Sequence, residues 1–257
     1  MPLALTGSLA AAGLLAGWPQ RAVITRLAVP ASEVREASEA PETSQPPPEA
    51  RAVPPALVVG CVTAVLLGAL AARAPHGTAA RDLVLAAACW LAICAVPLIF
   101  TDLAVSRLPD PLTAAAYAGT AALLLLAAAT ASGSTASAAV GSAAAGGHPA
   151  SWSALARALL GGLALAGFYL LLMIISPSGM SLGDVKLAAS LGTLLAWFGW
   201  RVLIAGGAAG FLLGGLSGVV LLASRRADRK QLIPFGPFMM AGTFLAVLTL
   251  PFLVTGR

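Results

Sequence analysis

Long apolar segments follow one another along this 257-residue chain, and short stretches that contain most of the Pro, Lys and Arg residues separate them. A helix needs about 20 apolar residues to cross the hydrocarbon core of a bilayer. The apolar runs are continuous rather than alternating, which argues against a membrane β-barrel. The pattern therefore predicts an all-α, polytopic integral membrane protein with about eight transmembrane helices. Their approximate spans are 3–18, 54–73, 82–100, 112–131, 154–175, 184–199, 202–223 and 235–254.

The composition supports a membrane protein and argues against a soluble domain, a nucleic-acid-binding protein and a zinc-binding or disulfide-rich protein. The chain is 59% hydrophobic and 10% charged, whereas a soluble domain carries about 25% charged residues. The net charge is +5, but no basic stripe with interleaved aromatic residues indicates a nucleic-acid partner. The three cysteines (Cys61, Cys89 and Cys94) lie in apolar runs without a CxxC pair, so neither a zinc site nor a disulfide framework is expected.

Lys and Arg residues in the loops predict how the helices are oriented, because cytoplasmic loops are enriched in them. With the N-terminus outside the cytoplasm, ten of the 15 basic residues face the cytoplasm. Helix counting then brings Asp102 and Asp184, far apart in sequence, to the same cytoplasmic face.

The predicted organisation has three parts. Residues 1–30 form a first membrane helix with its cytoplasmic end, and residues 54–257 form the main membrane-embedded domain. Between them, residues 31–53 are rich in Pro, Glu and Ser and contain no cysteine, which is typical of a mobile linker. In the seventh span, Gly206, Gly210, Gly214 and Gly218 recur every four residues, a spacing that favours close helix packing over a hinge.

Acidic residues are rare outside the linker, and carboxylates in or near a bilayer are functional candidates because burying them is costly. Asp102 ends an apolar run seven residues before Pro109, which interrupts the helix, and Asp110 follows as a candidate cap for the next helix. Two carboxylates at one membrane depth can share a proton and activate water. The alternatives are helix capping, pairing with Arg107 or Lys186, or an ion pathway.

The second acidic motif is Ser181-Leu-Gly183-Asp184-Val-Lys186. Gly183 permits an unusual backbone or a close helix approach directly before Asp184. Asp184 is then expected near a helix N-terminus, where the helix dipole favours an anion. Lys186 is interpreted either as a group that binds substrate or tunes the aspartates, or as an interfacial lysine whose charged end reaches water.

Together these motifs resemble the type IV prepilin peptidases, a family of intramembrane aspartic proteases. Asp102, Pro109 and Asp110 match the first family motif, and Gly183, Asp184 and Lys186 match the G-x-G-D-x-K motif. A third stretch, IPFGPFMMAG at 233–242, is similar to a family segment before the last helix. Ser181 stands where the family has its first glycine, and the paired CxxC motifs of many bacterial members are absent from the first loop.

The resemblance implies that Asp102 and Asp184 are the catalytic pair, and that Gly183, Lys186, Pro109 and Asp110 support them. It implies an endopeptidase of the bacterial plasma membrane whose partners are prepilins or pseudopilins of type IV pili or protein secretion. No cofactor is implied for proteolysis and no metal is expected. Methylation with S-adenosylmethionine stays open, because the loop lacks cysteines. The alternatives are a proton-coupled membrane transporter and a non-catalytic pilus assembly factor.

Overall fold

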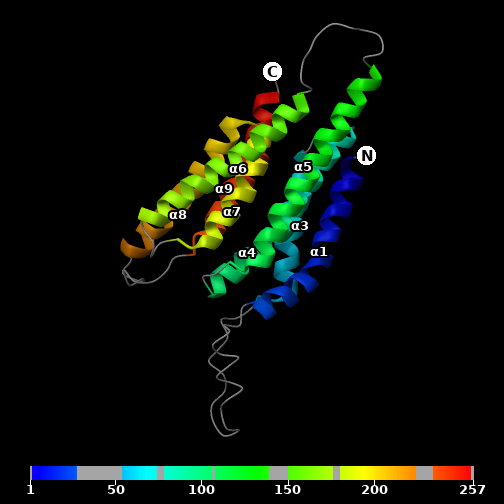
Figure 1. Cartoon of the computed structure of the whole chain (residues 1–257). Coiled ribbons are helices and arrows are strands. Elements are labelled where there is room, and N and C mark those ends of the chain that lie inside the picture. The colour runs from blue at the N-terminus through cyan, green and yellow to red at the C-terminus, as the bar shows by residue number, and fades with distance from the viewer. Residues whose placement is uncertain are drawn as a thin grey trace.

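The computed structural model of the chain describes residues 2–27, 54–73, 78–105, 108–138, 150–175, 180–223 and 234–255 (Figure 1). Within these ranges every regular element is a helix. The helices are α1 (Pro2–Leu27), α3 (Ala56–Arg73), α4 (Ala79–Val105), α5 (Asp110–Ala138), α6 (Ala150–Ile175), α7 (Leu182–Phe198), α8 (Trp200–Ala223) and α9 (Gly236–Thr255). The predicted linker at 31–53 lies outside the described residues.

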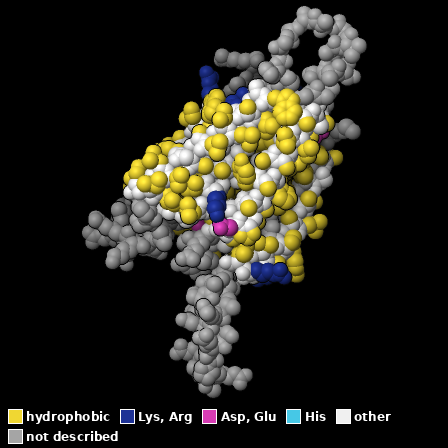
Figure 2. Space-filling view, viewed as in Figure 1, with side chains coloured by type: hydrophobic (Ala, Val, Ile, Leu, Met, Phe, Trp, Pro, Cys, Tyr) yellow, Lys and Arg dark blue, Asp and Glu magenta, His cyan; other side chains and the backbone are white. Residues whose placement is uncertain are grey.

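The all-α, polytopic membrane class predicted from the sequence is confirmed. Five of the described helices, α3, α4, α5, α6 and α8, are long and apolar enough to cross a membrane, and α9 contributes a shorter apolar stretch over Gly236–Thr249. The predicted first and sixth spans correspond to α1 and α7, which form helices but fall outside this group of five. In an apolar environment, helices satisfy their backbone hydrogen bonds internally. Many large apolar side chains of the described residues are exposed, and they cover much of the face seen in Figure 2.

The helices form two groups that lie side by side in Figure 1, with α1, α3, α4 and α5 in one group and α6, α7, α8 and α9 in the other. The closest pairs within the groups are α1 with α3, α4 with α5, α6 with α7, and α8 with α9. The groups meet mainly where α6 and α7 pack on α5 and where α9 packs on α4. Successive helices run in opposite directions, so chain order fixes which helix ends share a face.

Helix α7 lies largely inside the bundle. Eleven of its 17 residues are buried, and it contacts α4, α5, α6, α8 and α9. The guanidinium of Arg157 on α6 closes its C-terminal end by donating to the carbonyl oxygens of Ala196 and Trp197, at 2.8 and 2.7 Å. Gly199 then turns the chain into α8 with φ of 133°, a value that residues with a Cβ rarely adopt.

Three of the four glycines predicted as a packing face, Gly206, Gly210 and Gly214, make close approaches on α8. A Cβ at Gly210 would lie 3.0 Å from the Met239 Cα, and one at Gly214 would lie 2.3 Å from the Phe235 ring. In return, a Cβ at Gly242 on α9 would lie 2.3 Å from the Gly210 backbone nitrogen. These approaches hold α9 against α8 and thereby fix where α9 begins, which matters for the site described next.

Candidate active site

Asp102 lies in the last turn of α4 and points into the bundle, where it is 3% exposed. Its Oδ2 accepts a hydrogen bond of 3.1 Å from the backbone N–H of Gly236, the first residue of α9. The first N–H groups of a helix have no partner inside that helix, and the helix dipole favours a negative charge there. The N-terminus of α9 therefore holds Asp102 from across the bundle.

Asp184 is the third residue of α7 and is 5% exposed. Its Oδ2 accepts from the backbone N–H of Ser181 at 2.8 Å and from the Ser181 hydroxyl at 3.0 Å. The Asp184 N–H in turn meets the Ser181 hydroxyl oxygen at 3.3 Å, which completes a capping box. The predicted position of Asp184 near a helix N-terminus is confirmed. The helix-capping role predicted as an alternative is also observed, and it uses Oδ2 of the carboxylate.

The second carboxylate oxygen of Asp184 is in a different situation. Oδ1 is buried and has no hydrogen-bond partner among the described residues. A buried polar atom without a partner is costly, and such atoms in native proteins call for an explanation. Asp102 lies on α4 and is held by α9, and both helices contact α7, which carries Asp184. The two buried carboxylates therefore lie at one end of the bundle, on helices that pack together.

Gly183 and Pro109 act through the backbone. A Cβ at Gly183 would lie 2.7 Å from the Cβ of Leu108, so the glycine lets the start of α7 approach the segment that precedes α5. Of the two readings offered for Gly183, close approach is the one observed, since Gly199 has the one positive φ among the described glycines. The carbonyl of Pro109 accepts from the N–H groups of Leu112 and Thr113, both at 3.2 Å, and so begins α5.

Lys186 and Asp110 pair with each other rather than with the buried aspartates. The Lys186 Nζ lies 2.6 Å from Asp110 Oδ1, and the two side chains are 51% and 72% exposed. This exposed pair joins α7 to the first residue of α5. Pairing of Asp184 or Asp102 with Lys186 is therefore not observed, and Arg107 lies outside the described residues.

Tyr169 on α6 was not singled out from the sequence. It is 1% exposed, and its ring centroid lies 5.8 Å from that of Phe235, the residue before Gly236. Its helix, α6, packs closely on α7, which carries Asp184. The residue therefore links the segment that holds Asp102 to the surroundings of Asp184. An aromatic residue in an apolar helix gives no such signal, because most are ordinary packing residues.

Gly236 and Ser181 were noticed in the sequence without their roles. The glycine belongs to the IPFGPF stretch. Its N–H donates to Asp102, 134 positions away in the sequence, so the contact could be recognised only in the folded structure. Ser181 appeared as a departure from a glycine motif, whereas the S-x-x-D spacing is itself a capping signal. Among the described residues, no group of three or more His, Cys, Asp and Glu side chains is placed to hold a metal ion.

Comparisons with known proteins give one consistent result. Seven curated proteins with significant similarity carry the name prepilin leader peptidase/N-methyltransferase. The protein from Pseudomonas aeruginosa is 38% identical over 96 residues, which cover 37% of this chain and 32% of the relative. The protein from Bacillus subtilis is 38% identical over 100 residues, or 38% and 37% of the two chains.

The protein from Aeromonas hydrophila is 32% identical over 116 residues, which cover 39% of each chain. The aligned segments thus span about a third of the length of these relatives. No family model and no solved structure matches the chain. The motifs and these similarities support the type IV prepilin peptidase family for this chain.

Proposed function

We propose that this protein is an intramembrane aspartic endopeptidase that removes the leader peptide of prepilins or pseudopilins. The observation that carries the proposal is the pair of buried carboxylates at one end of the bundle, Asp102 and Asp184, one of which keeps an unpartnered oxygen. Buried acids inside a membrane protein are functional candidates. The similar proteins are named as prepilin leader peptidases, and this supports prepilins as the substrate class.

In the proposed mechanism the two carboxyl groups share one proton, because two like charges at short range do not both ionise easily. The ionised carboxylate takes a proton from a water molecule while the water oxygen attacks the scissile carbonyl carbon. The neutral partner donates a hydrogen bond to the carbonyl oxygen as negative charge develops there. The C–N bond then breaks, and the departing amine receives the proton.

The anchors of the two aspartates support this division of labour. Asp102 is held through one oxygen by Gly236, and Asp184 is held through one oxygen by Ser181. Each side chain is thereby oriented without using both of its oxygens. Unpartnered Oδ1 of Asp184 is the atom best suited to meet water or the scissile peptide. Preorganised geometry of this kind is what a positioned acid–base pair requires.

We further propose that the site faces the cytoplasm of a bacterium from its plasma membrane. The support is the excess of Lys and Arg in the loops on this side of the bundle, following the rule that cytoplasmic loops are positively charged. Methylation of the new N-terminus is left as a question for the assay below, because the first loop lacks the paired cysteines of many family members.

The test is a cleavage assay with purified full-length protein and a cognate prepilin in detergent, read by mass spectrometry of the product N-terminus. Asp102→Asn and Asp184→Asn should each abolish leader removal while the thermal unfolding temperature changes little. Asp82→Asn is the matched control, because Asp82 is an exposed carboxylate at the other end of the same helix, α4.

Undiminished cleavage by either active-site variant would refute the proposed dyad. Loss of cleavage in the Asp82→Asn control as well would show that the assay reports general damage. A mass increase of one methyl group on the product, dependent on added S-adenosylmethionine, would add the second activity named for the relatives.

A further inference from the structure

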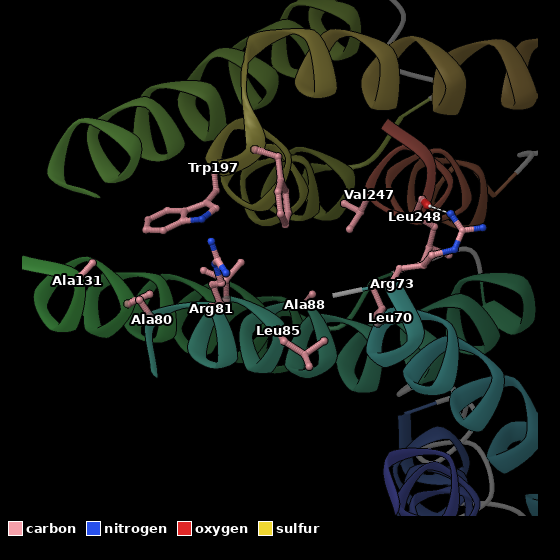
Figure 3. Close-up of a pocket in the computed structure, with 13 residues that line it drawn as sticks. Leu70, Arg73, Ala80, Arg81, Leu85, Ala88, Ala131, Trp197, Val247 and Leu248 are labelled. Carbon is pink, nitrogen blue, oxygen red and sulfur yellow. Dashed lines mark hydrogen bonds between the residues drawn. The ribbon is translucent and has the colours of Figure 1, made fainter. Parts of the chain in front are cut away.

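A cavity of about 230 Å³ opens at the end of the bundle opposite to the two aspartates. Its walls come from both helix groups, with apolar side chains of α3, α4, α5, α7 and α9. Two arginines, Arg73 and Arg81, are the charged residues that line it (Figure 3). An apolar hollow with cationic groups at its mouth is separate in place and in chemistry from the candidate active site.

The cavity runs from the level of the helix ends into the bundle. Arg73 is the last residue of α3, and Arg81 lies in the first turn of α4; both are exposed. Further along α4 the lining continues with Leu85 and Ala88, which are buried. Ala88 lies seven positions after Arg81, which corresponds to about 10 Å along the helix axis. The cavity therefore suits a ligand that has an anionic group at one end and an apolar part about 10 Å long.

We propose that this cavity binds one anionic phospholipid, with its phosphate on Arg81 and part of an acyl chain along Leu85 and Ala88. Arginine forms strong, charge-assisted hydrogen bonds with phosphate oxygens. In Figure 3 the Arg81 side chain extends from α4 toward Trp197 on the facing wall. Arg73 uses Nη1 to donate to the carbonyl oxygen of Leu248 at 3.1 Å, so it closes the other side of the cavity.

The lining favours a lipid over a free phosphate ion as the occupant. Eleven of the 13 lining residues are apolar, and Arg73 and Arg81 are the other two. A ligand with an apolar chain covers this apolar lining, whereas a free phosphate ion leaves it exposed to water. The arginines at the mouth select an anionic headgroup over a zwitterionic one, because net negative charge at the interface is attracted to them. The inference does not depend on the proposed peptidase activity.

The test is native mass spectrometry of the full-length protein, delipidated in detergent and titrated with dioleoylphosphatidylglycerol or dioleoylphosphatidylcholine. We expect one tight phosphatidylglycerol molecule per protein, bound at least tenfold more tightly than phosphatidylcholine. Arg81→Gln should lower the phosphatidylglycerol affinity about tenfold and reduce the preference for phosphatidylglycerol over phosphatidylcholine. Arg201→Gln is the matched control, because Arg201 is an exposed arginine at the start of α8, at the same end of the bundle, and does not line the cavity.

A second variant tests the apolar part. Ala131→Leu places three extra carbon atoms on the α5 wall without changing charge, and it should lower the affinity for phosphatidylglycerol at least fivefold. Equal binding of the two lipids, equal loss in Arg81→Gln and Arg201→Gln, or full binding by Ala131→Leu would each overturn the proposal. Circular dichroism and thermal unfolding of each variant ensure that a lost lipid reflects the site.

Discussion

Gly236 is the position where the structure makes its sharpest prediction about the site. A Cβ added there would lie 2.8 Å from Asp102 Oδ2, about 0.5 Å closer than an ordinary C···O contact of about 3.3 Å. The φ of Gly236 is not positive, so alanine brings no backbone strain. The methyl group of Gly236→Ala must therefore push the Asp102 carboxylate away from the N–H that holds it.

The expected size of the effect follows from the contact that is lost. A hydrogen bond to a charged group contributes about 1.5–3 kcal/mol, and catalytic groups must be held within about 0.5 Å of their productive geometry. If this interaction is weakened by even about 1.4 kcal/mol in the transition state, the rate falls tenfold. We therefore expect Gly236→Ala to lower kcat/KM for prepilin cleavage at least tenfold.

Gly215→Ala on α8 is the matched control, because a Cβ there meets no atom within 4 Å and alanine favours the helix by about 1 kcal/mol. Both variants would be compared with the wild type for cleavage at several substrate concentrations and for thermal unfolding in the same detergent. A folded Gly236→Ala protein that cleaves within twofold of the wild-type rate would refute the argued role of the Gly236 contact.

Three further predictions concern the surroundings of the site and the start of α8. Ser181→Ala removes the α7 cap and should cost about 1 kcal/mol, a fall in Tm of about 2–4 °C, whereas Ser181→Gly should cost only a few tenths of a kcal/mol; equal losses would refute the capping argument. Lys186→Ala should change stability by less than about 1 kcal/mol, since the pair with Asp110 is exposed; a larger fall in Tm would contradict that reading. Gly199→Ala should cost about 1–3 kcal/mol through its φ of 133°, although a Cβ there meets no atom within 4 Å; a wild-type Tm would show that the turn adjusts.

Hydrophobic length carried most of the fold prediction. The lengths of the apolar runs predicted α3, α8 and α9 to within two residues at each end, because a long apolar segment in a membrane has helix as its stable form. The same rule predicted α7 as the sixth span, and a helix forms there; eleven of its 17 residues are buried, so other helices surround much of it. Hydropathy indicates that a segment is excluded from water, but it does not distinguish a lipid environment from a protein interior.

The site was predictable to the extent that its parts are local in sequence. Helix direction alone put Asp102 and Asp184 at one end of the bundle, and the capping spacing explains the position of Asp184. The pairing of Lys186 with Asp110, 76 positions apart, and the contact of Gly236 with Asp102 depend on how helices pack. Such contacts leave no periodic signal in a single sequence, so they appeared only with the structure.

Both aspartates are held by hydrogen bonds from backbone N–H groups at the N-terminus of a helix. Asp184 takes its donors from the start of its own helix, whereas Asp102 takes its donor from the start of α9. In both cases a carboxylate meets free N–H groups at a positive helix end, which compensates part of the cost of burying it. Because α7 and α9 are in contact, the distance between the carboxyl groups is set by helix packing rather than by any bond between them. Substitutions that shift α9 against α8, such as those at Gly210 or Gly242, should therefore impair cleavage without touching either aspartate.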